Sequence, residues 1–245
     1  KTTDDMMFKF TLKDGETPIN LKLEDFFGKP PKTVMTDTTV EKNYAPIKYD
    51  NQKFDEYLNA VLQIEAVACK DWLTNKVDRS VTGKVAQQQN VGALQLPLAD
   101  YGTVSIDYSN TYGIATALGH APAVALINPQ AGSRLAIAES LTNIVFAPLT
   151  NGINAISLSA NWMWPCKNKG EDARLYAAVE AASDFAIKLG INIPTGKDSL
   201  SMTQKYPSEK PVMSPGTVII TAAGEVYNYK LGVTPDQKPI ENTTI

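Results

Sequence analysis

The side chains whose types and spacing most suggest chemistry are a carboxylate and a carboxamide four residues apart, Glu139 and Asn143. They lie between Pro129 and Leu149, in a segment of apolar and small residues that predicts a helix. Residues four apart point the same way on a helix, so the two oxygen-bearing groups would share one face. Such a pair favours a hard cation or a phosphate-bearing ligand. The alternative is a solvated or capping pair, because polar pairs at this spacing are common on helices.

The rest of this segment divides into two predicted faces. The face that carries the polar pair continues through small residues, which would leave room for a ligand: Gly132, Ala136 and Ala147. The other face would form the buried stripe of an amphipathic helix. Its members are Leu135, Ala138, Leu141, Ile144 and Val145.

A third candidate, Asp100, stands between Ala99 and the pair Tyr101-Gly102, in a segment predicted to pass through the interior as a strand. A carboxylate is costly to bury unless it is paired or bound to a metal. Gly102 would allow a ligand to approach the backbone closely. The sequence therefore predicts that Asp100 takes part in a binding site.

The composition excludes several classes of protein. With 245 residues, of which 43% are hydrophobic and 20% charged, the chain can bury one substantial core and carry appended segments. A net charge of -3 and the lack of a basic stripe argue against a nucleic-acid partner. No apolar run approaches the ~20 residues that cross a bilayer. Cys69 and Cys166 are too few for a disulfide framework, which fits a reducing cytoplasm.

The order of predicted elements indicates an α+β fold with helices on one face of a mixed or antiparallel sheet. Residues 1–50 are expected to be the tail of a preceding domain and a connector, 51–228 the core, and 229–245 a linker toward a next domain. The chain begins at Lys1 without Met, so we expect a piece of a longer protein. Within the core we expect helices over 54–70, 129–149 and 170–190. Strands are expected near 81–85 and 104–108, within 111–122 with a turn at Gly119-His120, from Ile156 to a corner at Asn161-Trp162, and over 216–226. A short strand followed by a polar loop is expected over 191–202.

The remaining polar features support weaker predictions. His120, the only histidine, is expected at a surface turn and not as a base or ligand. Lys197 and Asp198 fall in the predicted polar loop, and their roles stay open. Asp78 and Arg79 are either a surface ion pair or part of a loop that grips a phosphate.

Five stretches, in one order along the chain, resemble the synthase portion of the large, glutamine-dependent phosphoribosylformylglycinamidine synthases. The resemblance extends from about Leu21 to Val226 and is highly specific, because each motif is several residues long. The stretches are VDRSVTGKVAQQQNVGALQLPLADYG, ATALGHAP, SRLAIAESLTNIVFAPL, LSANWMWPCKNKGEDARLY and GINIPTGKDSLSM.

The resemblance implies a domain with a ferredoxin-like sheet and helices on one face, as in the N-terminal domain of aminoimidazole ribonucleotide synthetase. It also implies that this chain is the first domain of the second of two repeated synthase halves. The parent enzyme would be a ligase that uses ATP and glutamine to convert formylglycinamide ribonucleotide to the amidine in purine biosynthesis. Its remaining domains would be the partners of this one.

The resemblance further implies roles for individual residues. The family's magnesium ligands correspond here to Asp100, Glu139 and Asn143, and the backbone of Ala99 would face the nucleotide. The implied cofactors are Mg²⁺ and ATP or ADP. The nucleotide site of the second half is expected to be an auxiliary, structural one, so no catalytic residue is assigned to this chain.

Some parts of the family pattern fall outside this sequence. A fourth acidic magnesium ligand, the catalytic histidine and the glutaminase cysteine are expected in other domains of the parent. Asn90 stands where relatives often carry cysteine, so a thiol role is excluded at that position. We therefore expect the isolated chain to be inactive.

Two alternative hypotheses of function remain. The chain could be a non-catalytic scaffold whose sheet edge pairs with a sister domain or with a second copy of itself, forming a homodimer. It could also be another member of the same superfamily, such as a selenophosphate synthetase or a thiamine-phosphate kinase. The cysteine, selenocysteine or Asp-rich motifs of those enzymes are not visible in the sequence.

Overall fold

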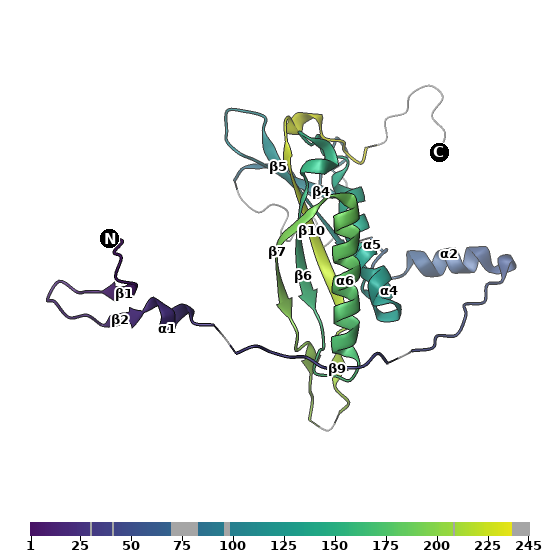
Figure 1. The fold of residues 1–245 in the computed structure, drawn as a ribbon. Coiled ribbons are helices and arrows are strands. Elements are labelled where there is room, and N and C mark those ends of the chain that lie inside the picture. The colour runs from purple at the N-terminus through teal and green to yellow at the C-terminus, as the bar shows by residue number, and fades with distance from the viewer. Residues whose placement is uncertain (30, 41, 70–82, 96–98, 208, 237–245) are drawn as a thin grey trace. The chain divides into compact units, whose positions relative to one another are not determined.

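A computed structural model describes residues 1–29, 31–40, 42–69, 83–95, 99–207 and 209–236. The chain divides into two compact units, Lys1–Thr36 and Asp37–Ile245. The first unit is an antiparallel hairpin followed by a short helix (Figure 1). Its elements are β1 (Met7–Phe10), β2 (Ile19–Lys22) and α1 (Leu23–Phe27).

The second unit is built on a six-stranded mixed sheet, and its strand order is β3-β4-β5-β10-β6-β7. All neighbouring strands pair antiparallel except β6 and β7, which are parallel. The strands are β3 (Val85–Gln87), β4 (Tyr101–Ser105), β5 (Gly113–His120), β10 (Thr217–Val226), β6 (Ser157–Met163) and β7 (Asn192–Ser199). A separate small sheet pairs β8 (Thr203–Gln204) with β9 (Val212–Met213). The mixed α+β architecture predicted from the sequence is confirmed.

Helices α4 (Pro122–Ile127), α5 (Pro129–Ile144) and α6 (Glu171–Leu189) form a layer against this sheet (Figure 1). Helix α5 packs on β5 and β10, and α6 packs on α5. The core between the layers includes Ile137, Ile144 and Leu158, which are almost fully buried. Short 3-10 turns complete the unit: η1 (Asn51–Lys53), η2 (Gly152–Ala155) and η3 (Tyr229–Leu231). None of the helices in the described parts of the chain is long and apolar enough to cross a bilayer.

Local sequence explains where the two long helices begin and end. Helix α5 starts at Pro129, and the Asn128 side chain accepts a hydrogen bond from the Ala131 N–H at 2.8 Å. Helix α6 has Glu171 in its first turn and ends at Gly190, whose φ of 70° is the left-handed conformation that glycine adopts without strain. The predicted helix over 170–190 is confirmed.

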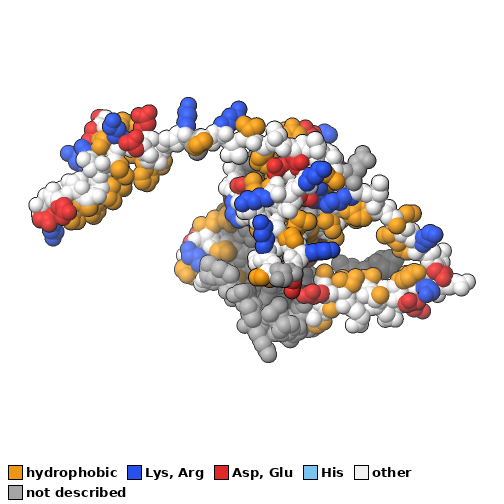
Figure 2. All heavy atoms as spheres, turned by 90° about the horizontal axis from the view of Figure 1, so that it is seen from below, with side chains coloured by type: hydrophobic (Ala, Val, Ile, Leu, Met, Phe, Trp, Pro, Cys, Tyr) orange, Lys and Arg blue, Asp and Glu red, His pale blue; other side chains and the backbone are white. Residues whose placement is uncertain are grey.

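The predicted packing helix over 54–70 is wrong in length and in burial. Helix α2 covers Phe54–Leu62, and none of its residues is buried. Its apolar side chains, among them Phe54 and Leu58, are exposed, and hydrophobic side chains lie among charged ones on the molecular surface (Figure 2). The helical periodicity was recognisable, but periodicity alone does not show that a partner surface exists within the same chain.

The predicted polar loop that holds Lys197 and Asp198 is also wrong. These residues lie in β7, which pairs in parallel with β6, opposite Asn161 and Trp162. A Cβ atom at Gly196 would overlap the backbone oxygen of Ala160, so glycine permits the close approach of the two strands.

The phase of the strand expected near 104–108 is reversed. In β4 the buried residues are Tyr101 and Thr103, whereas Val104 is 40% exposed and Ile106 lies beyond the strand. Both alternating sets contain residues that suit a strand, so alternation could not fix which set faces the helices. Asp78 and Arg79 lie outside the described residues. The start of the strand expected from Val81 also lies outside them.

Candidate functional site

The site begins with the close packing of α5 on β5. The inward-facing residues of β5 are all small: Gly113, Ala115, Ala117 and Gly119. A Cβ atom at Gly119 would overlap the backbone oxygen of Ala136 and the backbone nitrogen of Ser140. The helix backbone therefore lies directly against the strand, within reach of the strand's own backbone groups.

Two side chains of α5 bind the backbone of β5 at its carboxyl end. Glu139 Oε2 accepts the backbone N–H of His120 at 2.6 Å. Asn143 Nδ2 donates to the carbonyl oxygen of Leu118 at 2.9 Å. The distance between residues four apart on the helix thus matches the distance between residues two apart on the strand. These contacts are to a neighbouring strand, so the pair is neither a solvated pair nor a cap of its own helix.

These hydrogen bonds leave an oxygen on each side chain. A carbonyl accepts and does not donate, so the Leu118 contact fixes Asn143 with its nitrogen toward the strand and its Oδ1 elsewhere. Glu139 keeps Oε1. Among the described residues, neither oxygen has a hydrogen-bond partner. Two fixed oxygens of this kind match the ligands that Mg²⁺ takes in proteins.

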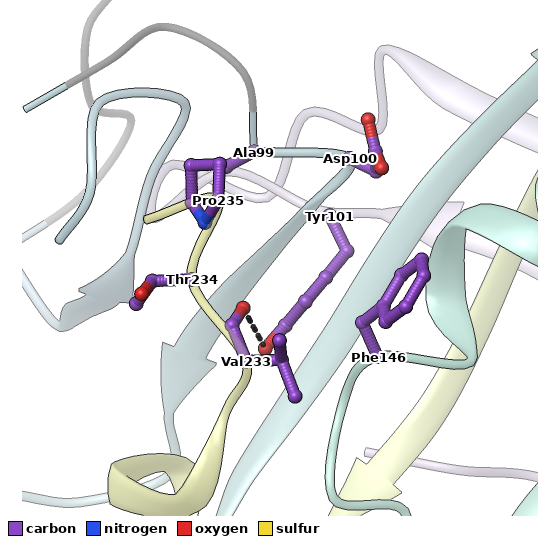
Figure 3. A pocket seen from close by; sticks show the side chains of 7 residues that line it. All are labelled: Ala99, Asp100, Tyr101, Phe146, Val233, Thr234 and Pro235. Carbon is purple, nitrogen blue, oxygen red and sulfur yellow. Dashed lines mark hydrogen bonds between the residues drawn. The ribbon is translucent and has the colours of Figure 1, made fainter. Parts of the chain in front are cut away.

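Asp100 is exposed and immediately precedes β4. The expectation of a carboxylate inside a buried strand is therefore wrong, because the buried residue there is Tyr101, which is 4% exposed. Figure 3 shows the Asp100 carboxylate pointing away from the hydrogen bond, 3.4 Å long, that joins the Tyr101 hydroxyl to the Val233 carbonyl. Burial thus provides no argument for a metal at Asp100.

The register of the sheet nevertheless places Asp100 at the end of the sheet where Glu139 and Asn143 bind β5. Tyr101 at the start of β4 lies opposite Ala117 of β5. The preceding residue, Asp100, is therefore next in register to Leu118, whose carbonyl is bound by Asn143. The backbone of Asp100 therefore lies at the same end of the sheet as the β5 backbone that α5 binds.

A small cavity of about 120 Å³ opens beside Asp100. Figure 3 shows side chains from three parts of the chain around it. The lining residues are Ala99, Asp100, Tyr101, Phe146, Val233, Thr234 and Pro235. Ligand pockets for whole small molecules typically measure about 300–1,000 Å³. This cavity is therefore large enough for part of a nucleotide only.

The predicted faces of α5 are partly wrong. The small residues expected to face a ligand, Gly132, Ala136 and Ala147, are buried in packing contacts. Leu135 and Val145, expected in the core, are 47% and 54% exposed. Small residues lie where the α5 backbone contacts β5, and the bulky core positions of the helix are Ile137 and Ile144, so Leu135 and Val145 face outward.

His120 is exposed at the end of β5, and its backbone, not its imidazole, makes the contact with α5. The expected exposure is confirmed, but the expected turn at Gly119-His120 is wrong, because both residues lie in β5. Cys69 and Cys166 are both free thiols. No group of three or more His, Cys, Asp or Glu side chains capable of holding a metal occurs within the described ranges. The candidate ligand set includes only two carboxylates together with an amide.

The segment 233–235 also lines the cavity beside Asp100, and this contact was not predicted from the sequence. The segment follows the last strand and returns to cover Tyr101, as the Val233 contact shows. Its polar and proline-containing sequence is typical of a linker, and no local pattern indicates which strand it would contact.

Comparison with known proteins identifies the family of this chain. The model of the FGAR-AT PurM_N-like domain matches residues 69–225, which is more than half of the chain. The chain belongs to the FGAR-AT PurM_N-like domain family.

Among curated relatives, phosphoribosylformylglycinamidine synthase of Dictyostelium discoideum is 40% identical over 96% of this chain and 18% of that protein. The human protein of the same name is 42% identical over 91% of the chain and 16% of that protein. This FGAR-AT PurM_N-like chain thus spans less than a fifth of the length of these relatives.

Solved structures share the fold at low sequence identity. PurLQS from Thermotoga maritima superimposes with a TM-score of 0.57 at 15% identity, covering 96% of this chain and 34% of that one. PurL of the same organism complexed with ATP gives a TM-score of 0.55, also at 15% identity, covering 95% of this chain and 33% of that one. The chain therefore shares its fold with these structures.

Proposed function

We propose that this chain is part of a phosphoribosylformylglycinamidine synthase and contributes a magnesium-nucleotide site to it. The relatives that carry this name are about two-fifths identical to nearly the whole chain. The parent enzyme would be a cytoplasmic ATP-dependent ligase with glutamine as amido donor, acting in purine biosynthesis. The other domains of that enzyme would be the partners of this chain.

Asp100, Glu139 and Asn143 would hold the magnesium ion, and the backbone of Ala99 would lie beside the nucleotide. One observation carries this assignment. Glu139 and Asn143 each use one atom to bind the backbone of β5 and keep one oxygen, in register with the start of β4 where Asp100 stands. Carboxylate and amide oxygens around a phosphate-bearing ligand are the donor set that Mg²⁺ requires.

The proposed role is to hold a nucleotide and not to carry out bond-making chemistry. The carboxylates of Asp100 and Glu139 would be engaged by the ion, and the cavity covers only part of a nucleotide. Bound magnesium would neutralise phosphate charge. The two β5 hydrogen bonds fix the orientation of the α5 ligands before the ion arrives, which lowers the entropy cost of binding.

Isothermal titration of the chain with Mg-ADP tests the proposal. Asp100→Asn and Glu139→Gln should each weaken binding on the order of tenfold or more, as loss of metal-site groups typically does. Glu180→Gln and Asp184→Asn, in exposed positions of α6, remove matched charges and should leave the affinity unchanged. Absence of binding at millimolar nucleotide, or equal affinity for all variants, would contradict a site formed by these residues.

We also propose that the sheet and its helices have a ferredoxin-like arrangement. Strands β5 and β6 are joined through α5 and have β10 between them, which is the split β-α-β arrangement of ferredoxin-like domains. The parallel contact between β6 and β7 adds an adjacent β-α-β unit. This arrangement supports a likeness to the N-terminal domain of aminoimidazole ribonucleotide synthetase.

A scaffold role is the second candidate, and the open edge of the sheet favours it. Strand β7 pairs only with β6 within the described chain, and most of its residues are exposed. Such an edge can accept another strand from a sister domain or a second copy. Sedimentation of the chain at increasing concentration would show a dimer if copies pair, whereas a monomer throughout would count against self-pairing.

A further inference from the structure

A groove of about 430 Å³ lies between α6 and β7, the last strand in the order of the main sheet. None of its lining residues belongs to the proposed magnesium site. Large apolar side chains line most of it: Trp162, Leu175, Val179, Ile193 and Leu200. Its volume falls within the range of about 300–1,000 Å³ that is typical of ligand sites. The groove can therefore take a large side chain or a small molecule.

Asp198 is the acidic side chain of this groove. It lies opposite Trp162 in the parallel pair of β6 and β7, so the carboxylate and the indole share one face of the sheet. Within the described ranges, Asp198 makes no hydrogen bond and no ion pair. Lys197 also lines the groove, but its Nζ donates to Ser199 Oγ at 2.7 Å, and successive side chains of a strand lie on opposite faces. The groove thus combines an aromatic ring with a carboxylate that no described cation neutralises.

The chain already binds one guanidinium group with this combination of partners, at the tryptophan that follows β6. Arg174 Cζ lies 5.4 Å from the centre of the Trp164 ring, and Arg174 Nη1 pairs with Glu171 Oε2 at 2.5 Å. The ring centres of Trp162 and Trp164 are only 6.4 Å apart. Trp162 and Asp198 therefore repeat the aromatic and acidic parts of the neighbouring arrangement, and no described residue supplies a guanidinium to them.

We propose that the groove between α6 and β7 binds an arginine side chain of a neighbouring polypeptide segment. A guanidinium group is attracted to the face of an indole, and it also forms two parallel hydrogen bonds with a carboxylate. The stem of the arginine would pack on Leu175 and Val179, because long charged side chains bury their methylene groups along apolar surface. Arginine suits the site better than lysine, because its planar group can stack and form the paired hydrogen bonds.

The exposure of the groove favours a side chain over a free small molecule. Val179 is 42% exposed and Asp198 is also exposed, so a ligand lying between them keeps one side in contact with solvent. Sites for free small molecules typically bury about 70–90% of the ligand surface. A polypeptide segment adds contacts outside the groove, and the edge of the sheet at β7 offers it a surface to lie along. The expected ligand is therefore an arginine flanked by apolar residues.

NMR titration of the isotope-labelled 245-residue chain with the peptide acetyl-Leu-Arg-Leu-amide tests the proposal. The indole N–H signal of Trp162 and the amide signals of Gly196 and Asp198 should shift and saturate. The same peptide with citrulline in place of arginine has nearly the same shape without the charge, and it should bind about five- to tenfold more weakly. Equal affinity of the two peptides would overturn the proposal. Acetyl-arginine-amide alone should bind more weakly than the tripeptide, and equal affinity of these two would overturn the assignment to a polypeptide ligand.

Two pairs of variants locate the binding. Asp198→Asn should remove most of the preference for arginine over citrulline, whereas Asp184→Asn, at an exposed position of α6 outside the groove, should leave it unchanged. Trp162→Leu should weaken binding of the arginine peptide, whereas Tyr176→Leu, which removes a 69% exposed ring of α6, should not. An unchanged preference in Asp198→Asn would contradict the proposal. The titration contains neither magnesium nor nucleotide, so its outcome is independent of the Mg-ADP experiment.

Discussion

Replacing Gly119 with alanine should destabilise the chain and displace α5 from β5. The new Cβ atom would overlap the backbone oxygen of Ala136 and the backbone nitrogen of Ser140, and would lie 3.1 Å from the Ser140 Cα. All three are backbone atoms of one helix, so no single side chain can rotate away to relieve the overlap. Overpacking in a core costs about 1–3 kcal/mol, and we expect about 3 kcal/mol at this position.

Urea unfolding of Gly119→Ala, compared with Gly102→Ala, measures this effect. A Cβ at Gly102 on the neighbouring strand would meet only the Gln87 oxygen at 3.6 Å, an ordinary contact, so that variant should change the free energy of unfolding by less than about 1 kcal/mol. For a chain of this size, 3 kcal/mol lowers the melting temperature by about 6–12 °C. If both variants unfold alike, the close packing of α5 on β5 described above is incorrect.

Two other predictions concern the start of α6. Arg174 forms a buried ion pair with Glu171 at 2.5 Å. Arg174→Ala should therefore lower the free energy of unfolding by about 3–5 kcal/mol, whereas Arg134→Ala, at an exposed position, should change it little. Equal urea midpoints for the two variants would contradict this expectation. Burial, followed by the nearby carboxylates, raises the pKa of Cys166 to about 12, so iodoacetamide at pH 8 should alkylate it far more slowly than exposed Cys69, as followed by mass spectrometry. Because the folded-state pKa is the higher one, stability from this thiol is present below its ordinary pKa of 9.0 and is lost as the pH rises toward 12; alkylation of both thiols at one rate would refute the assignment.

Regular elements with strong local signals could be predicted from the sequence. Helix α6 carries acidic residues at its start and Gly190 at its end, and β10 is a continuous apolar run, so both were located within a residue or two. The candidate ligands Glu139 and Asn143 were also identified from spacing and motif. Their local environment follows from helix geometry.

Features that depend on distant contacts could not be predicted. The inward face of β4 and the exposure of Leu135 depend on how closely α5 approaches β5, and no short stretch of sequence specifies that distance. The Asp236 contact with the Gly92–Leu94 turn joins segments far apart in the chain. Such tertiary contacts override local patterns.

The expected burial of Asp100 failed for a related reason. The residues around it have the apolar character of a strand, but β4 begins one residue later, and the aspartate marks its boundary. A polar residue at a strand end resembles a polar residue inside a strand when only the sequence is considered. Register with β5 was needed to place Asp100 at the same end of the sheet as the backbone that the α5 pair binds.

The most direct test of the proposed magnesium-nucleotide site is paramagnetic broadening of amide signals by Mn²⁺, added with ADP in place of Mg²⁺. The proposed site predicts the strongest broadening at Asp100, Leu118 and His120, because the ligands lie where β4 begins and β5 ends. Glu139→Gln should reduce this broadening. Broadening that is strongest in another part of the chain, or that persists unchanged in the variant, would contradict the proposed site.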